Sequence, residues 1–117
     1  MDPVTGLALA RLTLGTVSLV SPRLAARTFL LNPDTNPQLG PMTRLFGSRE
    51  AALGAITLLS SGKARQQVVQ LGVAVDGADA FAGLAGAVRG EVSKPAGLLL
   101  AAVAVGAVVV GVRELTD

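Results

Sequence analysis

The chain has 117 residues, half of them hydrophobic and only 15% charged, with a formal net charge of +2. A typical soluble domain carries about 25% charged residues, so this chain cannot cover its surface with charge. It contains neither Cys nor His, which excludes disulfides, thiolate or imidazole metal ligands, and Cys or His catalysis. The basic residues are scattered along the sequence, which excludes a nucleic-acid-binding patch.

The first predicted element is an apolar helix over residues 4–20, interrupted by Arg11 and by small hydroxyl residues. No basic residue precedes it and no convincing cleavage motif follows it, so we expect it to be a membrane span and not a signal peptide. Residues 22–31, which include Arg23 and Arg27, are expected to form either a short helix at the membrane interface or an ordered connector.

Two further spans are predicted over residues 43–61 and 66–88, preceded by a Pro-rich loop and separated by the polar turn SSGKAR. Arg49 and Glu50 lie side by side in the earlier span, and the later span contains two Asp residues. A charged residue at the centre of a span costs about 2.5 to 3.5 kcal/mol on the insertion scale, whereas an apolar Leu or Val contributes roughly −0.3 to −0.6 kcal/mol. Neither helix should therefore insert alone while its charged groups are ionised, and each needs partners in the membrane or protons.

The last predicted span, PAGLLLAAVAVGAVVVGV at residues 95–112, contains no charge, amide or hydroxyl. A helix that is apolar on all sides needs protein core or lipid around it, and about 18 residues just cross a bilayer. The predicted fold class is therefore all-α, a transmembrane four-helix bundle forming a single membrane domain over residues 1–117. The loops on the two membrane faces carry similar numbers of Lys and Arg, which leaves the orientation open.

Helical spacing places the ionisable residues of the first three spans on faces rich in small residues. Arg11, Glu50 and Asp76 each lie near the middle of their spans, so we expect them to meet at one depth. The predicted buried charge network comprises Arg11, Arg49, Glu50, Asp76 and Asp79. Small residues that let membrane helices approach closely are predicted at Gly15, Gly47, Gly54, Gly72, Gly83 and Gly86.

Two interpretations of the charge network are open. In one, it fixes the packing and register of the first three helices. In the other, a proton shared by Asp76 and Asp79 makes a proton or cation relay or a pocket for a lipid headgroup. A catalytic role is disfavoured, because DGADA matches only the beginning of the acidic motif of membrane phosphatidyltransferases and the rest of that motif is absent.

Three segments, ALARLTLGTVSLVSPRLAARTF, RLFGSREAALGAITLL and LGVAVDGADAFAGLAG, precede a featureless final helix. This order resembles a group of small four-span integral membrane proteins common in actinobacteria, which are distantly similar to the DoxX-like group. The resemblance covers nearly the whole chain, and FGSRE and VDGADA are its most specific pieces. It implies a four-helix membrane fold and no particular activity, and a link to respiratory or redox complexes would be analogy only.

The chain has no Trp or Tyr and so lacks the aromatic belt that anchors many bundles at the membrane interfaces. Small residues four apart in the last span, Ala102 with Gly106 and Ala107 with Gly111, are typical of helix contacts. We therefore expect a multi-pass protein of the inner or plasma membrane, embedded in lipid, that is an accessory, structural or assembly component of a larger complex or homo-oligomer. No catalytic residue, metal, cofactor or nucleic acid is predicted, and the competing expectation is a small transport or ligand-binding module.

Overall fold

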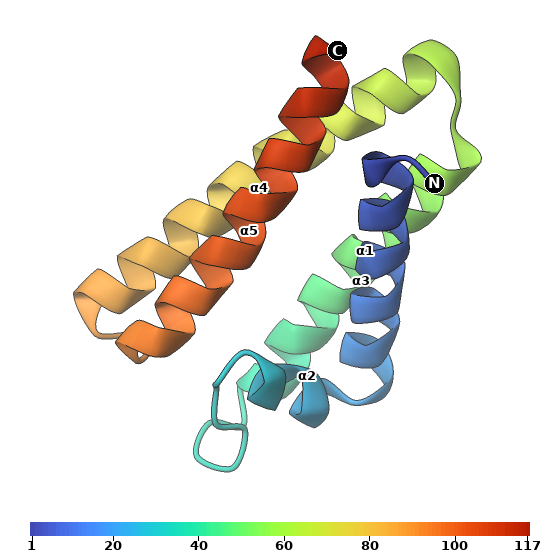
Figure 1. Ribbon diagram of the computed structural model, residues 1–117. Coiled ribbons are helices and arrows are strands. Elements are labelled where there is room, and N and C mark those ends of the chain that lie inside the picture. Colours follow the sequence, from blue (N-terminus) through green and yellow to red (C-terminus); the bar gives the residue numbers. More distant parts are fainter. The chain divides into compact units, whose positions relative to one another are not determined.

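The computed structural model describes residues 1–117 and contains five helices and no strand (Figure 1). The helices are α1 (Pro3–Val20), α2 (Pro22–Thr28), α3 (Leu39–Leu59), α4 (Gly62–Arg89) and α5 (Lys94–Thr116). The all-α class predicted from the sequence is confirmed. The chain divides into two compact units, a three-helix unit of Thr5–Leu59 and a hairpin unit of Met1–Val4 with Ser60–Asp117.

Three helices, α1, α4 and α5, are long and apolar enough to cross a membrane. The prediction of a membrane protein is confirmed to that extent, but the prediction of four such spans is not met. The exception is α3, which has 21 residues. Its charged residues Arg44, Arg49 and Glu50 are placed so that no 18-residue stretch of the helix avoids them.

Helix bounds differ from the predicted spans mainly at the N-terminal ends. Helix α3 begins at Leu39, before the predicted start at residue 43. Pro41 is tolerated there because it lies in the first turn, where its missing N–H costs no helical hydrogen bond. Helix α4 begins at Gly62, so most of the predicted turn SSGKAR belongs to its first turn. The predicted interfacial segment 22–31 is helical only over Pro22–Thr28, and Leu30 beyond it has a left-handed backbone with φ of 63°.

In the three-helix unit, α2 packs against α3 with a small apolar face. Ala25 and Ala26 are buried on that face. Just beyond α2, the Phe29 ring meets the Phe46 ring of α3 edge to face, with the centroids 6.3 Å apart. The side chain of Ser21 caps the start of α2 by accepting a hydrogen bond from the backbone N–H of Leu24. Seven residues are too few for a stable isolated helix, so these contacts hold α2 in place.

In the hairpin unit, α4 and α5 are joined by a short turn and pack along their length (Figure 1). Gly90 ends α4 in the left-handed conformation, with φ of 73°, which glycine adopts without steric cost. Ser93 then caps α5 by accepting a hydrogen bond from the Ala96 N–H at 3.2 Å. A Cβ on Gly97 would lie 2.7 Å from the Gly83 carbonyl oxygen, so the two backbones are in direct contact at this point.

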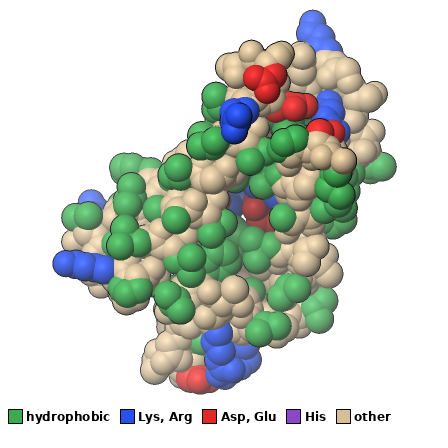
Figure 2. Space-filling view, viewed as in Figure 1, with side chains coloured by type: hydrophobic (Ala, Val, Ile, Leu, Met, Phe, Trp, Pro, Cys, Tyr) green, Lys and Arg blue, Asp and Glu red, His purple; other side chains and the backbone are tan.

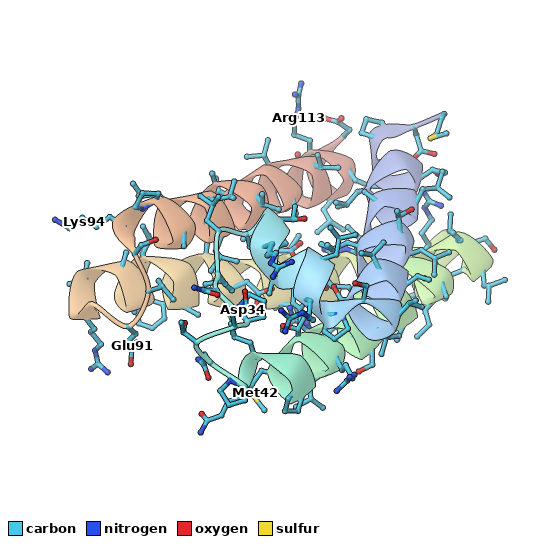
Figure 3. All side chains as sticks on the ribbon, turned by 90° about the horizontal axis from the view of Figure 1, so that it is seen from below. Asp34, Met42, Glu91, Lys94 and Arg113 are labelled. Atoms are coloured by element: carbon cyan, nitrogen blue, oxygen red, sulfur yellow. The ribbon has the colours of Figure 1, made fainter.

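The outward side of α5 is apolar, with exposed residues Leu98, Val105 and Val109. Hydrophobic side chains are spread over much of the molecular surface that Figure 2 shows. Charged residues mark both ends of α5: Lys94 lies with Glu91 at the α4–α5 turn, and Arg113 at the opposite end (Figure 3). An apolar exposed side bounded by charges is the pattern expected of a helix that faces lipid.

Candidate functional site

Arg11 of α1 and Glu50 of α3 form a buried ion pair inside the three-helix unit. Arg11 Nη1 donates a hydrogen bond to Glu50 Oε1 at 2.9 Å. Each side chain is only 7% exposed. A charge-assisted hydrogen bond of this length is about twice as strong as a neutral one. The contact therefore joins the middle of α1 to the middle of α3.

Glycines on either side of Glu50 allow the two helices to come this close. Gly47 lies one turn before Glu50 and Gly54 one turn after it. A Cβ on Gly54 would lie 2.6 Å from the Ala8 carbonyl oxygen, and a Cβ on Gly47 would lie 2.8 Å from the carbonyl oxygen of Gly15. The backbones of α1 and α3 thus touch above and below the ion pair, which fixes the distance that Arg11 and Glu50 have to bridge.

Arg49 lies at the edge of this contact and is held by two different groups. Its Nε is 3.6 Å from Glu50 Oε2, and its guanidinium carbon is 5.2 Å from the centroid of the Phe46 ring. Stacking of this kind stabilises Arg by about 0.5 to 1 kcal/mol at exposed sites. Because Phe46 also contacts Phe29, Arg49 links the ion pair to the packing of α2. Glu50 therefore lies between two guanidinium groups, that of Arg11 on α1 and that of Arg49 on its own helix.

The remaining residues of the predicted charge network lie on α4, in the hairpin unit. Asp76 is buried, with 3% of its surface exposed, and Asp79 is half-buried. The buried residues of α4 include the predicted Asp76 and the predicted small residues, and they are Val69, Gly72, Asp76, Gly83 and Gly86. The structure thus brings Arg11, Arg49 and Glu50 together, and a connection from them to the two Asp residues stays a prediction.

The predicted small residues lie at several kinds of contact. Gly15, Gly47 and Gly54 lie between α1 and α3, and Gly83 lies between α4 and α5. Gly72 is buried on α4, and a Cβ on Gly86 would meet the Val92 side chain at 3.3 Å. Two further close contacts are at Gly97, which was not predicted, and at Gly111, which belongs to the small-residue spacing predicted for the last span.

Gly111 lies at a contact within the hairpin unit. Its place in the small-residue pattern of the last span suggested association with another chain. In the structure, a Cβ on Gly111 would lie 2.5 Å from Val73 Cγ2, so the partner is α4 of the same hairpin. Gly106, five residues earlier, faces open space. Gly97, Ala101 and Ala104 are all buried on this face of α5, and their spacing of four and three residues is the sequence pattern that could have identified it.

Ser18 is a buried polar residue on the same side of α1 as Arg11. It has no exposed surface, its hydroxyl has no hydrogen-bond partner, and its Cβ lies against Gly47. We expect Ser18→Ala to raise the free energy of unfolding by about 1 kcal/mol, because the change removes an unsatisfied buried hydroxyl. Titration with sodium dodecyl sulfate in mixed micelles, followed by circular dichroism, measures this. A loss of stability would show that the hydroxyl forms a native hydrogen bond.

A second ion-pair cluster, which the sequence did not reveal, lies outside the helices that can span a membrane. Asp34, in the loop after α2, accepts hydrogen bonds from Arg23 and from Arg27, the latter at 3.0 Å. All three side chains are more than half exposed. The hydrogen bond from Arg23, followed by that from Arg27, holds the pKa of the Asp34 carboxyl below its ordinary value of 3.8.

This cluster predicts a pH dependence confined to α2 and its loop. Because the pKa of Asp34 is lower in the folded chain, the ionised carboxylate stabilises this segment above the unfolded pKa of about 3.9. That contribution is lost as the pH falls through the folded pKa. A carbon-13 NMR titration should give Asp34 a pKa below 3.8, and Arg23→Gln should raise it. An Asp34 pKa that does not move in the variant contradicts the ion pair.

Arg65 forms a third cluster, inside the hairpin unit. Its Nη2 is 3.0 Å from Asp2 Oδ1, and its Nε is 4.0 Å from Glu114 Oε1. These contacts bring the N-terminal residues of the chain, the first turn of α4 and the last turn of α5 to one place. Asp2 and Arg65 are 63 residues apart, and no periodicity within a helix predicts such a pairing.

The arrangement between α1 and α3 joins opposite charges across a glycine-lined contact. It offers hydrogen bonding and charge pairing, and the chain has no Cys or His to supply a thiol or imidazole group. No group of three or more Asp and Glu residues is arranged to hold a metal ion. Compared with models of protein families, with curated proteins and with solved structures, the chain shows no match in any of the three.

Proposed function

We propose that the chain is a small multi-pass protein of the inner or plasma membrane that serves as an accessory, structural or assembly component of a larger membrane complex or a homo-oligomer. The observation that carries this proposal is the buried ion pair between Arg11 and Glu50. Breaking such a pair leaves an uncompensated charge, so the pair selects one register of α1 against α3. Fixing helix register is the work of a structural component.

The proposal includes α3 as a fourth span. The ion pair between Asp2 and Arg65 supports this, because it places the beginning of α1 beside the beginning of α4. If α1 crosses the bilayer, residues 21–61 must return to the side on which α1 began. Helix α3 is the only helix there that is long enough, at about 31 Å for its 21 residues. Four spans are also what the resemblance to the DoxX-like membrane proteins implies.

The absence of cysteine makes the span count directly testable. Single-cysteine variants Thr35→Cys, before α3, and Ser61→Cys, after it, are treated with a membrane-impermeant maleimide before and after permeabilisation. We expect the two positions to react from opposite sides of the membrane. Ser93→Cys, in the α4–α5 turn, is expected to react from the same side as Thr35→Cys. Reaction of Thr35→Cys and Ser61→Cys from one side would place α3 on the membrane surface and overturn the fourth span.

The accessory role is tested by gentle detergent extraction of the native protein at its normal level, followed by size separation. We expect it to migrate with a larger assembly and Glu50→Gln to release it, because the variant weakens the register of α1 and α3. Arg44→Gln, which removes an exposed charge of the same helix, is the matched control and should leave the assembly intact. Migration of the wild-type chain as a single small bundle would contradict the accessory role.

A second candidate function, a transport or ligand-binding module, is favoured by Asp76. This carboxyl group is buried in the middle of α4, a helix that is long and apolar enough to cross a membrane. Ionisable residues in that position are costly and mark proton or ion pathways in many membrane proteins. Asp76→Asn with Asp79→Asn separates the two candidates. Loss of assembly fits a structural role, whereas a proton or cation function would fail while the assembly persists.

A further inference from the structure

We propose that the membrane face carrying α2 and the α4–α5 turn is the cytoplasmic face and binds anionic phospholipid headgroups, so that both chain termini lie on the opposite side. This inference rests on the proposed four-span arrangement and adds an orientation and a lipid partner to it. The basis is an uneven distribution of exposed basic residues between the two faces. The loops carry similar numbers of Lys and Arg, and the difference comes from Arg44, exposed on α3, and from the partial burial of Arg65.

Four spans place five basic residues on one face of the membrane. Two belong to α2, one to the first part of α3, and two flank the α4–α5 turn; they are Arg23, Arg27, Arg44, Arg89 and Lys94. All five are exposed. Arg23 and Arg27 stay more than half exposed while they bind Asp34, and a guanidinium has five N–H donors. These residues therefore keep donors for headgroup phosphates.

The opposite face carries only three basic residues, Lys63, Arg65 and Arg113. Arg65 is largely covered, with 22% of its side chain exposed, and it is bound to two carboxylates, Asp2 and Glu114. Figure 3 shows Lys94 and Arg113 at opposite ends of α5, so in the proposed arrangement Lys94 lies at one membrane face and Arg113 at the other. The face with Lys94 is thus the more basic one, both in number of cations and in their exposure.

Anionic lipids of the cytoplasmic leaflet attract exposed Lys and Arg residues near a span, and loops rich in these residues stay in the cytoplasm. Each Lys or Arg near an anionic surface contributes about 1 kcal/mol. Two additional basic residues therefore favour the orientation with the more basic face at the anionic leaflet by roughly 30-fold over the opposite orientation. The interaction is electrostatic and close to the bilayer, so it should depend on the lipid headgroup and on salt.

The orientation is tested in intact cells with Ser61→Cys and Ser93→Cys in the otherwise cysteine-free chain. We expect the impermeant maleimide to label Ser61→Cys in intact cells and Ser93→Cys only after permeabilisation. Labelling of Ser93→Cys in intact cells, while Thr35→Cys shares its side, overturns the orientation and leaves the four spans standing. Labelling of Thr35→Cys and Ser93→Cys from opposite sides overturns the four spans themselves.

The lipid partner is tested with purified protein in vesicles of phosphatidylcholine and of equal parts phosphatidylcholine and phosphatidylglycerol. We expect a higher unfolding temperature in the anionic vesicles at low salt. The variant R23Q/R27Q/R89Q/K94Q should lose this difference, whereas the control K63Q/R113Q should keep it. An equal unfolding temperature of the wild-type chain in both vesicles, or loss of the difference in the control alone, overturns headgroup binding at this face.

Discussion

Glu50→Leu is expected to lower the free energy of unfolding by about 3 to 5 kcal/mol, because it leaves the buried guanidinium of Arg11 without its carboxylate. Arg11→Met should also lower the free energy of unfolding, but by less, because Arg49 Nε stays 3.6 Å from Glu50 Oε2. The double variant R11M/E50L, which fills the site with apolar side chains of similar size, should recover most of the loss. Unfolding in mixed micelles, followed by circular dichroism, measures all three variants and gives the coupling energy between the two positions.

The matched control for this cycle is Arg44→Met, which removes an exposed charge from the same helix. We expect it to change the free energy of unfolding by less than about 0.5 kcal/mol. Additive effects of Arg11→Met and Glu50→Leu would mean that the two side chains do not interact, and the proposal that this pair sets the helix register would then fail.

Gly54→Ala should lower the free energy of unfolding by about 3 kcal/mol, at the upper end of the usual cost of overpacking. The reason is that the added methyl group would lie 2.6 Å from the Ala8 carbonyl oxygen and 2.8 Å from the backbone nitrogen of Leu12. Neither atom belongs to a flexible side chain that can turn away. The two helices must therefore separate, and their separation also stretches the ion pair that lies beside Gly54.

Gly77→Ala makes the same chemical change where there is room for it, because nothing lies within 4 Å of the added carbon. This control is expected to raise the free energy of unfolding by up to about 1 kcal/mol, since alanine favours the helix over glycine. Equal effects of Gly54→Ala and Gly77→Ala in mixed-micelle unfolding would mean that α1 and α3 do not touch at Gly54.

The helices were largely predictable because apolar length and Pro or Gly punctuation are local signals. The last span illustrates this, since its core at residues 95–112 lies inside α5 (Lys94–Thr116). The ends were less predictable, because a polar first turn such as that of α4 carries no apolar signal. Composition also cannot decide whether α3 crosses the membrane, since its charges can be offset by partners on another helix.

The sequence identified which residues belong to the candidate site better than it identified the contacts that these residues make. The spacing of Glu50 with the surrounding glycines identified the buried face of α3. Contacts made by side chains from distant segments, such as Arg65 with Asp2 or Arg27 with Asp34, follow from tertiary geometry and leave no periodic trace. The stacking of Arg49 on Phe46 is different, because the two residues are three apart on α3, a spacing at which helix side chains are neighbours.

The 39 residues that separate Arg11 from Glu50 have a consequence for how the chain is made. At a synthesis rate of about 5 to 20 residues per second, Arg11 leaves the ribosome roughly 2 to 8 s before its partner carboxylate. During that time α1 carries a cation with no Glu50 beside it. The nascent chain must therefore wait in a setting that tolerates a charge, such as the wet interior of an insertion channel, until α3 arrives to neutralise it.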